Sequence, residues 1–450
     1  MENTQNITQK RTRIIILAAF IILVIIFAVY AVIYALNAPG GKMLTREEIE
    51  SNLALARGEG DEGHSYTSTY LEEWGIRGYD SAKFKTCEFF FNKYTIYEMK
   101  GTEELAISTA ELFMDYFFDK IDKEDKAAVT DALLNCYVEA VGDKYAVYRT
   151  ETQFEDYNTN MSGSFVGIGV QVRYTEEDNT ITVVSVNRDS AAEVAGILAG
   201  DIIYAVDGEK VEDIGYEAAV SKIRGEIGTD VTVTVKRGDE LLDLVATRIQ
   251  IVEQSVIYEI TDEKIAVITI TGFKGNTAEQ FKAAVDKAEQ DGAVGIVFDM
   301  RDNPGGYLTS VVDVIDYLAP EGVRIASYTS STDGETVFVS DDGHSIDLPI
   351  AVVFNEYTAS AGELFSAAMR DYGDMGIFNT VSVGTQTYSK GVMQSTLTFT
   401  DKSTLTMTIA FYNPPCDVNY DGEGVKPDFE VADREAQLER AIAELKAIIK

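Results

Sequence analysis

Ser360 has the sequence setting of a nucleophile. It follows a short apolar run rich in valine, residues 349–354, which is typical of a buried strand. Apolar residues then recur at helical spacing from 361 to 369, which predicts a helix that begins just after the serine. A hydroxyl there lies among backbone N–H groups that favour developing negative charge. Because Ser360-x-x-Glu363 also matches a capping box, a nucleophile and a helix cap are both open.

Two further segments carry residues suited to such chemistry. The strand-like run 294–300 leads into a loop that ends in Gly305 and Gly306, and paired glycines let the backbone turn N–H groups toward a ligand. A simple Pro-Gly turn is the alternative. Lys390 can serve as a general base for a serine if burial lowers the pKa of a lysine from about 10.4 to about 7–8. Considered alone, it has the setting of a solvated loop lysine.

The supply of histidine and cysteine restricts other schemes. The chain has two histidines, His64 and His344, each in a polar loop, and it has no His-x-x-x-His or Cys-x-x-Cys. We therefore expect no metal site and no cofactor. The three cysteines, Cys87, Cys136 and Cys416, do not make a disulfide framework, and whether Cys87 pairs with Cys416 is left open.

The N-terminal segment predicts a membrane anchor. Residues 14–36 carry no charge, Gly or Pro, and as a helix rising about 1.5 Å per residue they would span roughly 35 Å, enough for a hydrocarbon core of about 30 Å. Lys10, Arg11 and Arg13 precede this run, so we expect a cytoplasmic N-terminus and an extracytoplasmic remainder at the cell membrane. The formal net charge of −36 argues against nucleic acid as a partner.

Periodicity predicts how the rest of the chain is organised. Helical spacing dominates residues 102–141. Short β-branched runs with two helical patterns fill residues 163–248, and residues 249–428 alternate strand and helix, as in an α/β fold with a largely parallel sheet. The predicted divisions are a cytoplasmic tail (1–13), a transmembrane helix (14–36), a stalk or linker (37–101), an N-terminal helical region (102–162), a small strand-rich domain (163–248), an α/β core (249–434) and a C-terminal helix (435–450).

Ordered motifs in this chain resemble those of the carboxy-terminal processing peptidases, also called tail-specific proteases. The core supplies D-M-R-D-N-P-G-G at 299–306, T-A-S-A-G-E-L at 358–364 and S-K-G-V-M-Q at 389–394. Upstream segments at 140–148, 164–169, 195–203, 206–208 and 223–229 follow in family order. The resemblance covers roughly residues 102–428 and implies a crossover strand–helix peptidase core at 249–434 with an inserted PDZ domain at 163–248.

The resemblance also implies catalytic roles for matching positions. Ser360 would be the nucleophile of a Ser–Lys dyad, Lys390 its general base and Gln394 the side chain that orients the lysine. Asp371 falls where some members of the family carry a supporting acid. No metal takes part in this scheme.

Two sets of backbone N–H groups would bind charge. The oxyanion hole would use the N–H of Ala361 with that of Gly305 or Gly306. The PDZ loop would bind the C-terminal carboxylate of a substrate, with the terminal side chain in an apolar pocket. That loop consists of Phe165, Val166, Gly167, Ile168 and Gly169.

The chain departs from the family pattern without losing a catalytic side chain. Ser389 stands where glycine usually precedes the lysine, Lys144 where proline is common and Ala146 where serine is. The leading hypothesis is therefore a membrane-anchored serine endopeptidase that cleaves proteins or peptides captured by their free C-termini. The alternative is a catalytically inactive, membrane-tethered PDZ scaffold. For residues 43–101, homodimer formation, docking of a partner and a spacer role are all open.

Overall fold

The computed structural model describes residues 43–56, 64–332, 334–341 and 343–449. Contacts divide the chain into two units. The first contains the described residues up to Phe154, together with Tyr328–Thr336 and Val392–Tyr412, and the second contains the remainder. No helix within these described ranges is long and apolar enough to cross a membrane, and the span predicted at 14–36 lies outside them.

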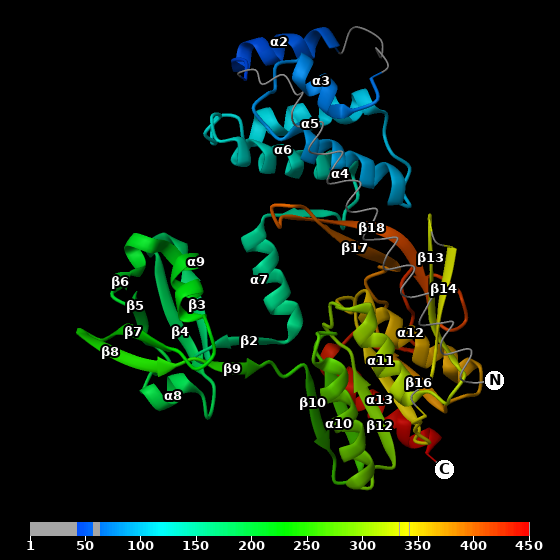
Figure 1. The fold of residues 1–450 in the computed structure, drawn as a ribbon. Coiled ribbons are helices and arrows are strands. Elements are labelled where there is room, and N and C mark those ends of the chain that lie inside the picture. The colour runs from blue at the N-terminus through cyan, green and yellow to red at the C-terminus, as the bar shows by residue number, and fades with distance from the viewer. Residues whose placement is uncertain (1–42, 57–63, 333, 342, 450) are drawn as a thin grey trace, which may run out of the picture. The chain divides into compact units, whose positions relative to one another are not determined.

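Helices build most of the first unit, and those in its described part share one apolar core (Figure 1). Two of them begin at aspartates, because the carboxylates of Asp80 and Asp125 accept hydrogen bonds from first-turn N–H groups. Phe84 and Tyr137 pack edge to face, with ring centroids 5.0 Å apart. The helices are α2 (Arg46–Ala56), α3 (Thr67–Glu73), α4 (Ser81–Tyr94), α5 (Thr102–Tyr116) and α6 (Lys126–Val141).

Helices α2, α3 and α4 occupy much of the described part of the region predicted as a stalk or linker at 37–101. Ile49 of α2, Leu71 of α3 and Phe91 of α4 are each 0% exposed and belong to the same core as α5 and α6. Short helices give weak periodic patterns, and they are stabilised mainly by packing against neighbours rather than by their own propensity. The sequence pattern therefore missed them.

Three strands complete the first unit. β1 (Val147–Arg149) pairs antiparallel with residues 404–406 of β18 (Thr404–Asn413), and β17 (Val392–Thr398) pairs antiparallel with residues 404–411 of the same strand. The sheet order is β1-β18-β13-β14, which adds β13 (Arg324–Ser330) and β14 (Gly334–Val339). The helix α7 (Glu151–Ser162) leads into the second unit.

A small domain of strands with two helices begins the second unit. Val231, Val233 and Val235 alternate inward along β7 and are 0–1% exposed. Buried Arg248 donates to the backbone oxygens of Lys222, at 2.6 Å, and Arg224, at 2.9 Å. The elements are β2 (Ser164–Gly167), β3 (Val170–Thr175), β4 (Thr180–Val186), α8 (Ala191–Ala195), β5 (Ile202–Val206), β6 (Glu209–Lys210), α9 (Val211–Ile223), β7 (Asp230–Arg237), β8 (Glu240–Thr247) and β9 (Ile249–Val252).

The α/β core has one mixed sheet in the order β10-β11-β12-β15-β16-β19. The first pair is antiparallel and the other pairs are parallel, which confirms the predicted α/β architecture. Its elements are β10 (Val256–Ile260), β11 (Ile265–Ile270), α10 (Thr277–Gln290), β12 (Gly295–Asp299), α11 (Leu308–Leu318), β15 (Ile350–Phe354), α12 (Ala361–Asp374), β16 (Thr380–Gly384), β19 (Phe429–Glu430) and α13 (Arg434–Ile448).

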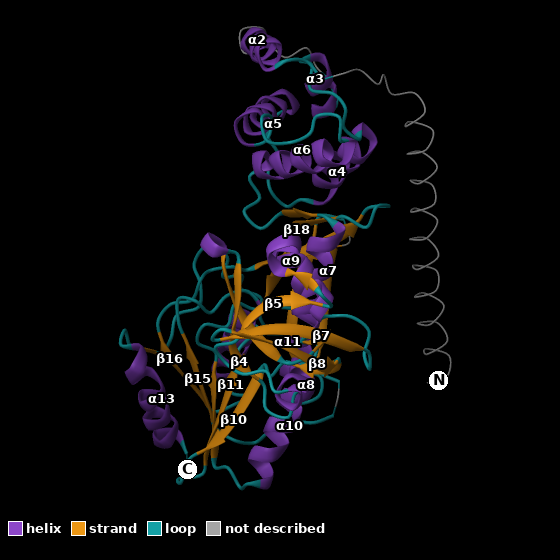
Figure 2. Cartoon of the chain, turned by 90° about the vertical axis from the view of Figure 1, so that its left-hand side faces the viewer, coloured by secondary structure: helices purple, strands orange, loops and turns teal. Residues whose placement is uncertain are grey.

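Helices cover both faces of this sheet (Figure 2). α13 packs on the face that carries Val297 and Val353. On the opposite face Phe298 of β12 contacts Phe281 of α10 and Phe365 of α12, with ring centroids 5.5 and 5.3 Å apart. Neighbouring residues 297 and 298 point to opposite faces because side chains alternate along a strand. Both faces are therefore buried, and the strand ends carry the loops.

Candidate active site

The three candidate catalytic segments follow three neighbouring parallel strands. The Gly305–Gly306 loop follows β12, Ser360 follows β15 and Lys390 lies beyond the end of β16. Adjacent parallel strands end at the same edge of a sheet, and ligand sites in α/β sheets lie at that carboxyl edge. Topology thus gathers residues that are far apart in the sequence.

Ser360 lies on a strained turn between β15 and α12. Its backbone has φ 54° and ψ −119°, a conformation that L-residues rarely adopt and that costs about 1–3 kcal/mol. Such strain clusters at functional sites, because the surrounding structure must hold it in place. The side chain is half-buried, so the hydroxyl is positioned by the fold yet can be reached.

Two glycines allow the neighbouring loop to approach this turn. A Cβ on Gly305, whose φ is 96°, would lie 2.8 Å from the Cβ of Ser360 and 2.9 Å from the backbone nitrogen of Ala361. A Cβ on Gly306 would lie 2.1 Å from the oxygen of Phe273. All three distances are shorter than a side chain tolerates. Glycine is therefore needed at both positions for the loop to pack against Phe273 and the Ser360 turn, and the approach of a ligand to these glycines stays a prediction.

The backbone N–H groups beside Ser360 differ in availability. Gly305 N–H already donates to Asn303 Oδ1 at 2.8 Å. The N–H groups of Ala361 and Gly306 donate to no other residue within the described ranges. Of the two glycines offered by the sequence, Gly306 is thus the better candidate to act with Ala361 on an oxyanion.

Buried polar side chains tie the two loops together. Asn303 is 0% exposed, and its amide donates to Ile270 O at 2.8 Å while its backbone oxygen accepts from Ala359 N–H at 2.9 Å. Thr358 donates to Met300 O at 2.8 Å, so this hydroxyl joins the end of β12 to the Ser360 turn and does not cap α12.

Glu363 connects Ser360 to the segment that carries Lys390. Its carboxylate is 0% exposed. One oxygen accepts from the N–H of Ser360 at 2.9 Å and from the N–H of Lys390 at 2.8 Å. The other accepts from Thr387 Oγ1 at 2.5 Å and from Ser389 N–H at 2.6 Å. The sequence suggested only a capping box for this residue, and its long-range partners lie outside any local pattern.

The question of cap or nucleophile can be answered in part. Ser360 and Glu363 adopt the arrangement of a capping box, but only the half formed by the Glu363 carboxylate meets the criteria of a hydrogen bond. The Ser360 side chain makes no hydrogen bond that caps α12. Its hydroxyl is therefore not committed to the helix.

The Lys390 segment has a backbone conformation that its sequence does not favour. Ser389 has φ 78°, in the left-handed region that favours glycine. This positive φ accounts for the glycine that is usual at the same position in the peptidase family that the chain resembles. Lys390 itself is half-buried. The neighbouring Tyr388 is 53% exposed, so its ring contributes little to shielding the lysine from water.

Two of the other predicted site residues have hydrogen-bond partners other than Ser360 and Lys390. Gln394 belongs to the first unit, where its amide donates to Thr408 Oγ1 at 3.3 Å, so its action on Lys390 stays a prediction. Asp371 lies roughly three helical turns along α12 from Ser360. Its carboxylate accepts from Cys416 N–H at 2.8 Å, and burial raises its pKa. The structure does not bring Asp371 to the serine.

The predicted carboxylate-binding loop precedes an edge strand of the small domain. Ile168 is 1% exposed, and Gly169 has φ 84° and no room for a Cβ, which would lie 2.5 Å from Ser190. In the described part of the chain, the N–H groups of Ile168 and Gly169 donate to no other residue. Phe165 and Val166 lie in β2 and Gly167 ends it. The following strand, β3, is at the sheet edge, where a peptide could add as a further strand.

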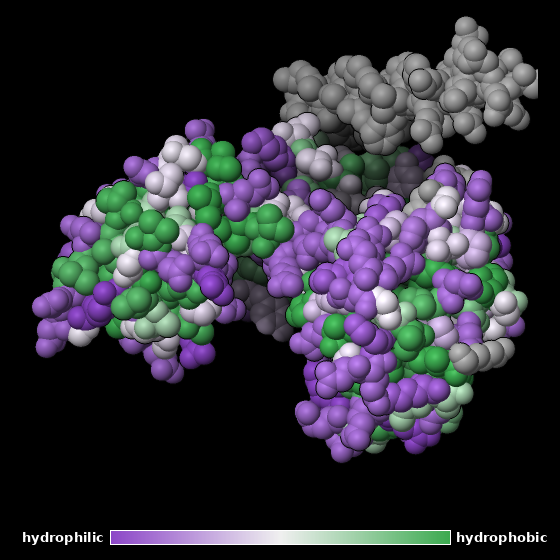
Figure 3. All heavy atoms as spheres, turned by 90° about the horizontal axis from the view of Figure 1, so that it is seen from below, coloured by the Kyte–Doolittle hydropathy of each residue, from purple (hydrophilic) through white to green (hydrophobic). Residues whose placement is uncertain are grey.

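The surface of this domain also carries exposed apolar side chains. Val194 is 85% exposed, Ile227 62% and Leu198 53%. Figure 3 shows apolar surface in green among hydrophilic purple.

Three cysteines of the described chain, Cys87, Cys136 and Cys416, are free thiols, so the pairing of Cys87 with Cys416 is not present.

Comparisons with known proteins match two parts of the chain to known families. Residues 264–431 match the model of peptidase family S41, and residues 166–247 match the model of a PDZ domain. A probable CtpA-like serine protease of Staphylococcus haemolyticus is 33% identical over 342 residues, which is 76% of this chain and 66% of that protein. The chain belongs to peptidase family S41.

A second curated relative and one solved structure are also similar to the chain. A probable CtpA-like serine protease of Staphylococcus aureus is 34% identical over 315 residues, which is 70% of this chain and 62% of that protein. The match thus spans less than two thirds of that relative's length. Among solved structures, a photosystem II D1 C-terminal processing protease is 22% identical and overlaps 81% of this chain and 96% of its own, with a TM-score of 0.46. The family S41 match includes strands β17 and β18 of the first unit.

Proposed function

We propose that this chain is a serine endopeptidase that uses a Ser360–Lys390 dyad. The observation that carries the proposal is the Glu363 carboxylate, because one of its oxygens accepts hydrogen bonds from the N–H groups of both residues. The two backbones are therefore held within two hydrogen-bond lengths of each other. Membership of family S41 and the similarity to serine proteases support the same reaction.

The proposed reaction has two halves. The amine of Lys390 takes the proton of the Ser360 hydroxyl while Oγ attacks the peptide carbonyl carbon. The negative oxygen of the tetrahedral intermediate accepts from the N–H groups of Ala361 and Gly306. The lysine ammonium then protonates the leaving amine, and the acyl-enzyme remains. Water deprotonated by the lysine hydrolyses the ester and regenerates the serine. Gln394 orients the lysine amine during these proton transfers.

The PDZ domain selects substrates in this proposal. Backbone N–H groups of the loop from Phe165 to Gly169 bind the terminal carboxylate, and the peptide extends the sheet beside β3. The exposed apolar side chains of the domain suit unfolded protein tails. A helix formed by residues 14–36 would anchor the enzyme in the cell membrane with its N-terminus in the cytoplasm and the peptidase outside.

The test of catalysis uses the full-length chain in detergent, because cutting near residue 101 would remove three helices from the core of the first unit. Wild type, Ser360→Ala and Lys390→Ala are incubated with an unfolded protein. Cleavage by wild type alone supports the dyad. Equal cleavage by wild type and both variants refutes it. If no protein cleaves while all bind peptide C-termini, the inactive PDZ scaffold is the better account.

Substrate capture and topology are tested separately. A peptide with a free C-terminus should bind more tightly than its amidated form, and equal affinity would refute carboxylate capture. A reporter enzyme that is active only outside the cytoplasm, fused after residue 450, should be active. An inactive reporter, in a fusion protein that is present in the membrane fraction, would refute the proposed orientation.

A further inference from the structure

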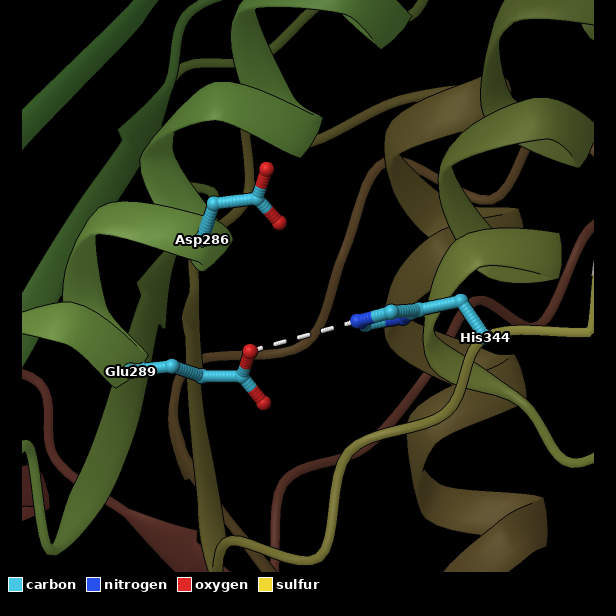
Figure 4. A group of neighbouring side chains, drawn as sticks. All are labelled: Asp286, Glu289 and His344. Carbon is cyan, nitrogen blue, oxygen red and sulfur yellow. Dashed lines mark ion pairs between the residues drawn. The ribbon is translucent and has the colours of Figure 1, made fainter.

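Three side chains that can bind a metal ion converge on one side of the α/β core, away from any residue proposed for catalysis (Figure 4). Asp286 and Glu289 lie three residues apart on α10 and therefore share one face of that helix. His344 comes from the loop that precedes β15. One ligand atom from each residue lies within 4.8 Å of the others. The cluster is independent of the proposed peptidase activity.

The hydrogen bonding of His344 fixes which nitrogen faces the carboxylates. Nδ1 lies 2.5 Å from the backbone oxygen of Tyr317, and since a carbonyl oxygen only accepts, Nδ1 carries the hydrogen. Nε2 lies 4.0 Å from a carboxylate oxygen of Glu289. In the neutral ring Nε2 therefore presents a lone pair toward an anion. A proton or a metal cation between them resolves this repulsion.

Tyr317 supplies the outer hydrogen bonds of the cluster. Its ring is parallel to that of His344, with centroids 3.8 Å apart, and its hydroxyl donates to Asp286 Oδ1. Metal-binding histidines usually donate their second ring N–H to a carbonyl or carboxylate, and ligating carboxylates are in turn hydrogen-bonded. One residue provides both kinds of support here. Lys282, whose ammonium lies 5.0 Å from the Tyr317 ring centroid, is the positive side chain that would compete with an ion.

The donor set selects the class of ion. One imidazole with two carboxylates suits Zn²⁺, whereas Ca²⁺ and Mg²⁺ take oxygen ligands. Zinc–ligand bonds of about 2.0–2.2 Å place two ligand atoms about 3.5 Å apart, which is closer than these ligand atoms now lie. The three side chains must therefore move about 1 Å toward one another to bind the ion. The side chains of His344 and Glu289 are 28% and 43% exposed, so the Glu289 carboxylate can turn toward the imidazole and a water ligand has room to bind.

We propose that Asp286, Glu289 and His344 bind one divalent transition-metal ion, with Zn²⁺ the best fit. The ion would join the loop that leads into β15 to helix α10. The sequence offered no sign of this site because its histidine is far along the chain from its carboxylates, and only packing of the loop on α10 and α11 brings them together.

The test measures Zn²⁺ uptake by calorimetry on full-length protein that is stripped with EDTA and carries no polyhistidine tag. Wild type at pH 7.5 should bind one ion per chain. His344→Ala and Glu289→Gln should weaken binding by about 100-fold or more, and Tyr317→Phe by about 10-fold. The matched control is His64→Ala, since His64 is the other histidine and also pairs with a glutamate, Glu73, at 3.0 Å. It should bind as wild type does.

Several outcomes would overturn the proposal. If His344→Ala and Glu289→Gln bind Zn²⁺ as tightly as wild type, the ion binds elsewhere. The same holds if His64→Ala loses Zn²⁺ binding. Absence of Zn²⁺ binding to folded wild type would refute the site itself. Equal affinity for Ca²⁺ or Mg²⁺ would refute the transition-metal class. Thermal melting confirms that each variant is folded.

Discussion

Replacing Glu363 by glutamine removes one acceptor oxygen from a buried carboxylate that binds four donors. An amide nitrogen at the position of Oε2 would face the N–H groups of Ser360 and Lys390, which now lie 2.9 and 2.8 Å from that oxygen. At the position of Oε1 it would face the N–H of Ser389, while the Thr387 hydroxyl could reverse and accept. Either orientation leaves at least one buried N–H facing another donor.

The size of the effect follows from these bonds. Each hydrogen bond to a charged acceptor contributes about 1.5–3 kcal/mol, so one or two lost bonds weaken the anchor by about 1.5–6 kcal/mol. Part of this loss lowers the free energy of unfolding, and part lets Lys390 move relative to Ser360. A misplacement of about 1 Å costs on the order of 100-fold in rate. We therefore expect Glu363→Gln to lower kcat/KM by about 100-fold, mainly through kcat.

The assay measures kcat and KM for cleavage of an unfolded protein, with thermal melting to show that the variant is folded at the assay temperature. The matched control is Glu356→Gln, which makes the same change four residues before the serine. Glu356 is exposed and accepts one hydrogen bond, from Thr385 Oγ1 at 2.7 Å. Its activity should stay within about twofold of wild type, as is usual for surface substitutions. A folded Glu363→Gln variant with wild-type kcat would refute the reasoning.

Three further predictions follow from single residues. Burial raises the pKa of Glu88 to about 7, so the wild type loses about 3 kcal/mol of unfolding free energy between pH 4.5 and pH 8 as this carboxyl ionises. Urea unfolding of Glu88→Gln should not show that loss. If the difference in unfolding free energy between wild type and variant does not change with pH, the prediction is wrong. Gly306→Ala places a Cβ 2.1 Å from Phe273 O, so proteolysis should fall by about 100-fold or more, and unchanged activity would exclude Gly306 from the oxyanion hole. Ser389→Gly removes the backbone strain of a non-glycine residue at φ 78° and should raise the free energy of unfolding by about 0.5–1 kcal/mol in the same assay. A lower free energy of unfolding would count against strain at this position.

The sequence by itself determined the type and order of the core elements. Alternating apolar runs and helical spacings predicted a largely parallel sheet, and the strands β12, β15 and β16 lie where those runs are. Ser360 and the paired glycines could be selected because each follows a strand directly, so a local pattern marks it. The turn that carries Ser360 and the loop of Gly305 and Gly306 do contact each other.

Packing between distant segments decided the rest. A local pattern records which residues are apolar, but it does not record which buried polar groups will meet, because those distances depend on how the elements pack. Glu363 looked like half of a helix cap, and only the fold reveals that it also binds the Lys390 segment. The same holds for His344, which meets Asp286 and Glu289 only because the loop before β15 packs against α11 beside α10. Gly306 rather than Gly305 keeps its N–H available, because the N–H of Gly305 donates to the side chain of Asn303, which is itself held by the distant Ile270.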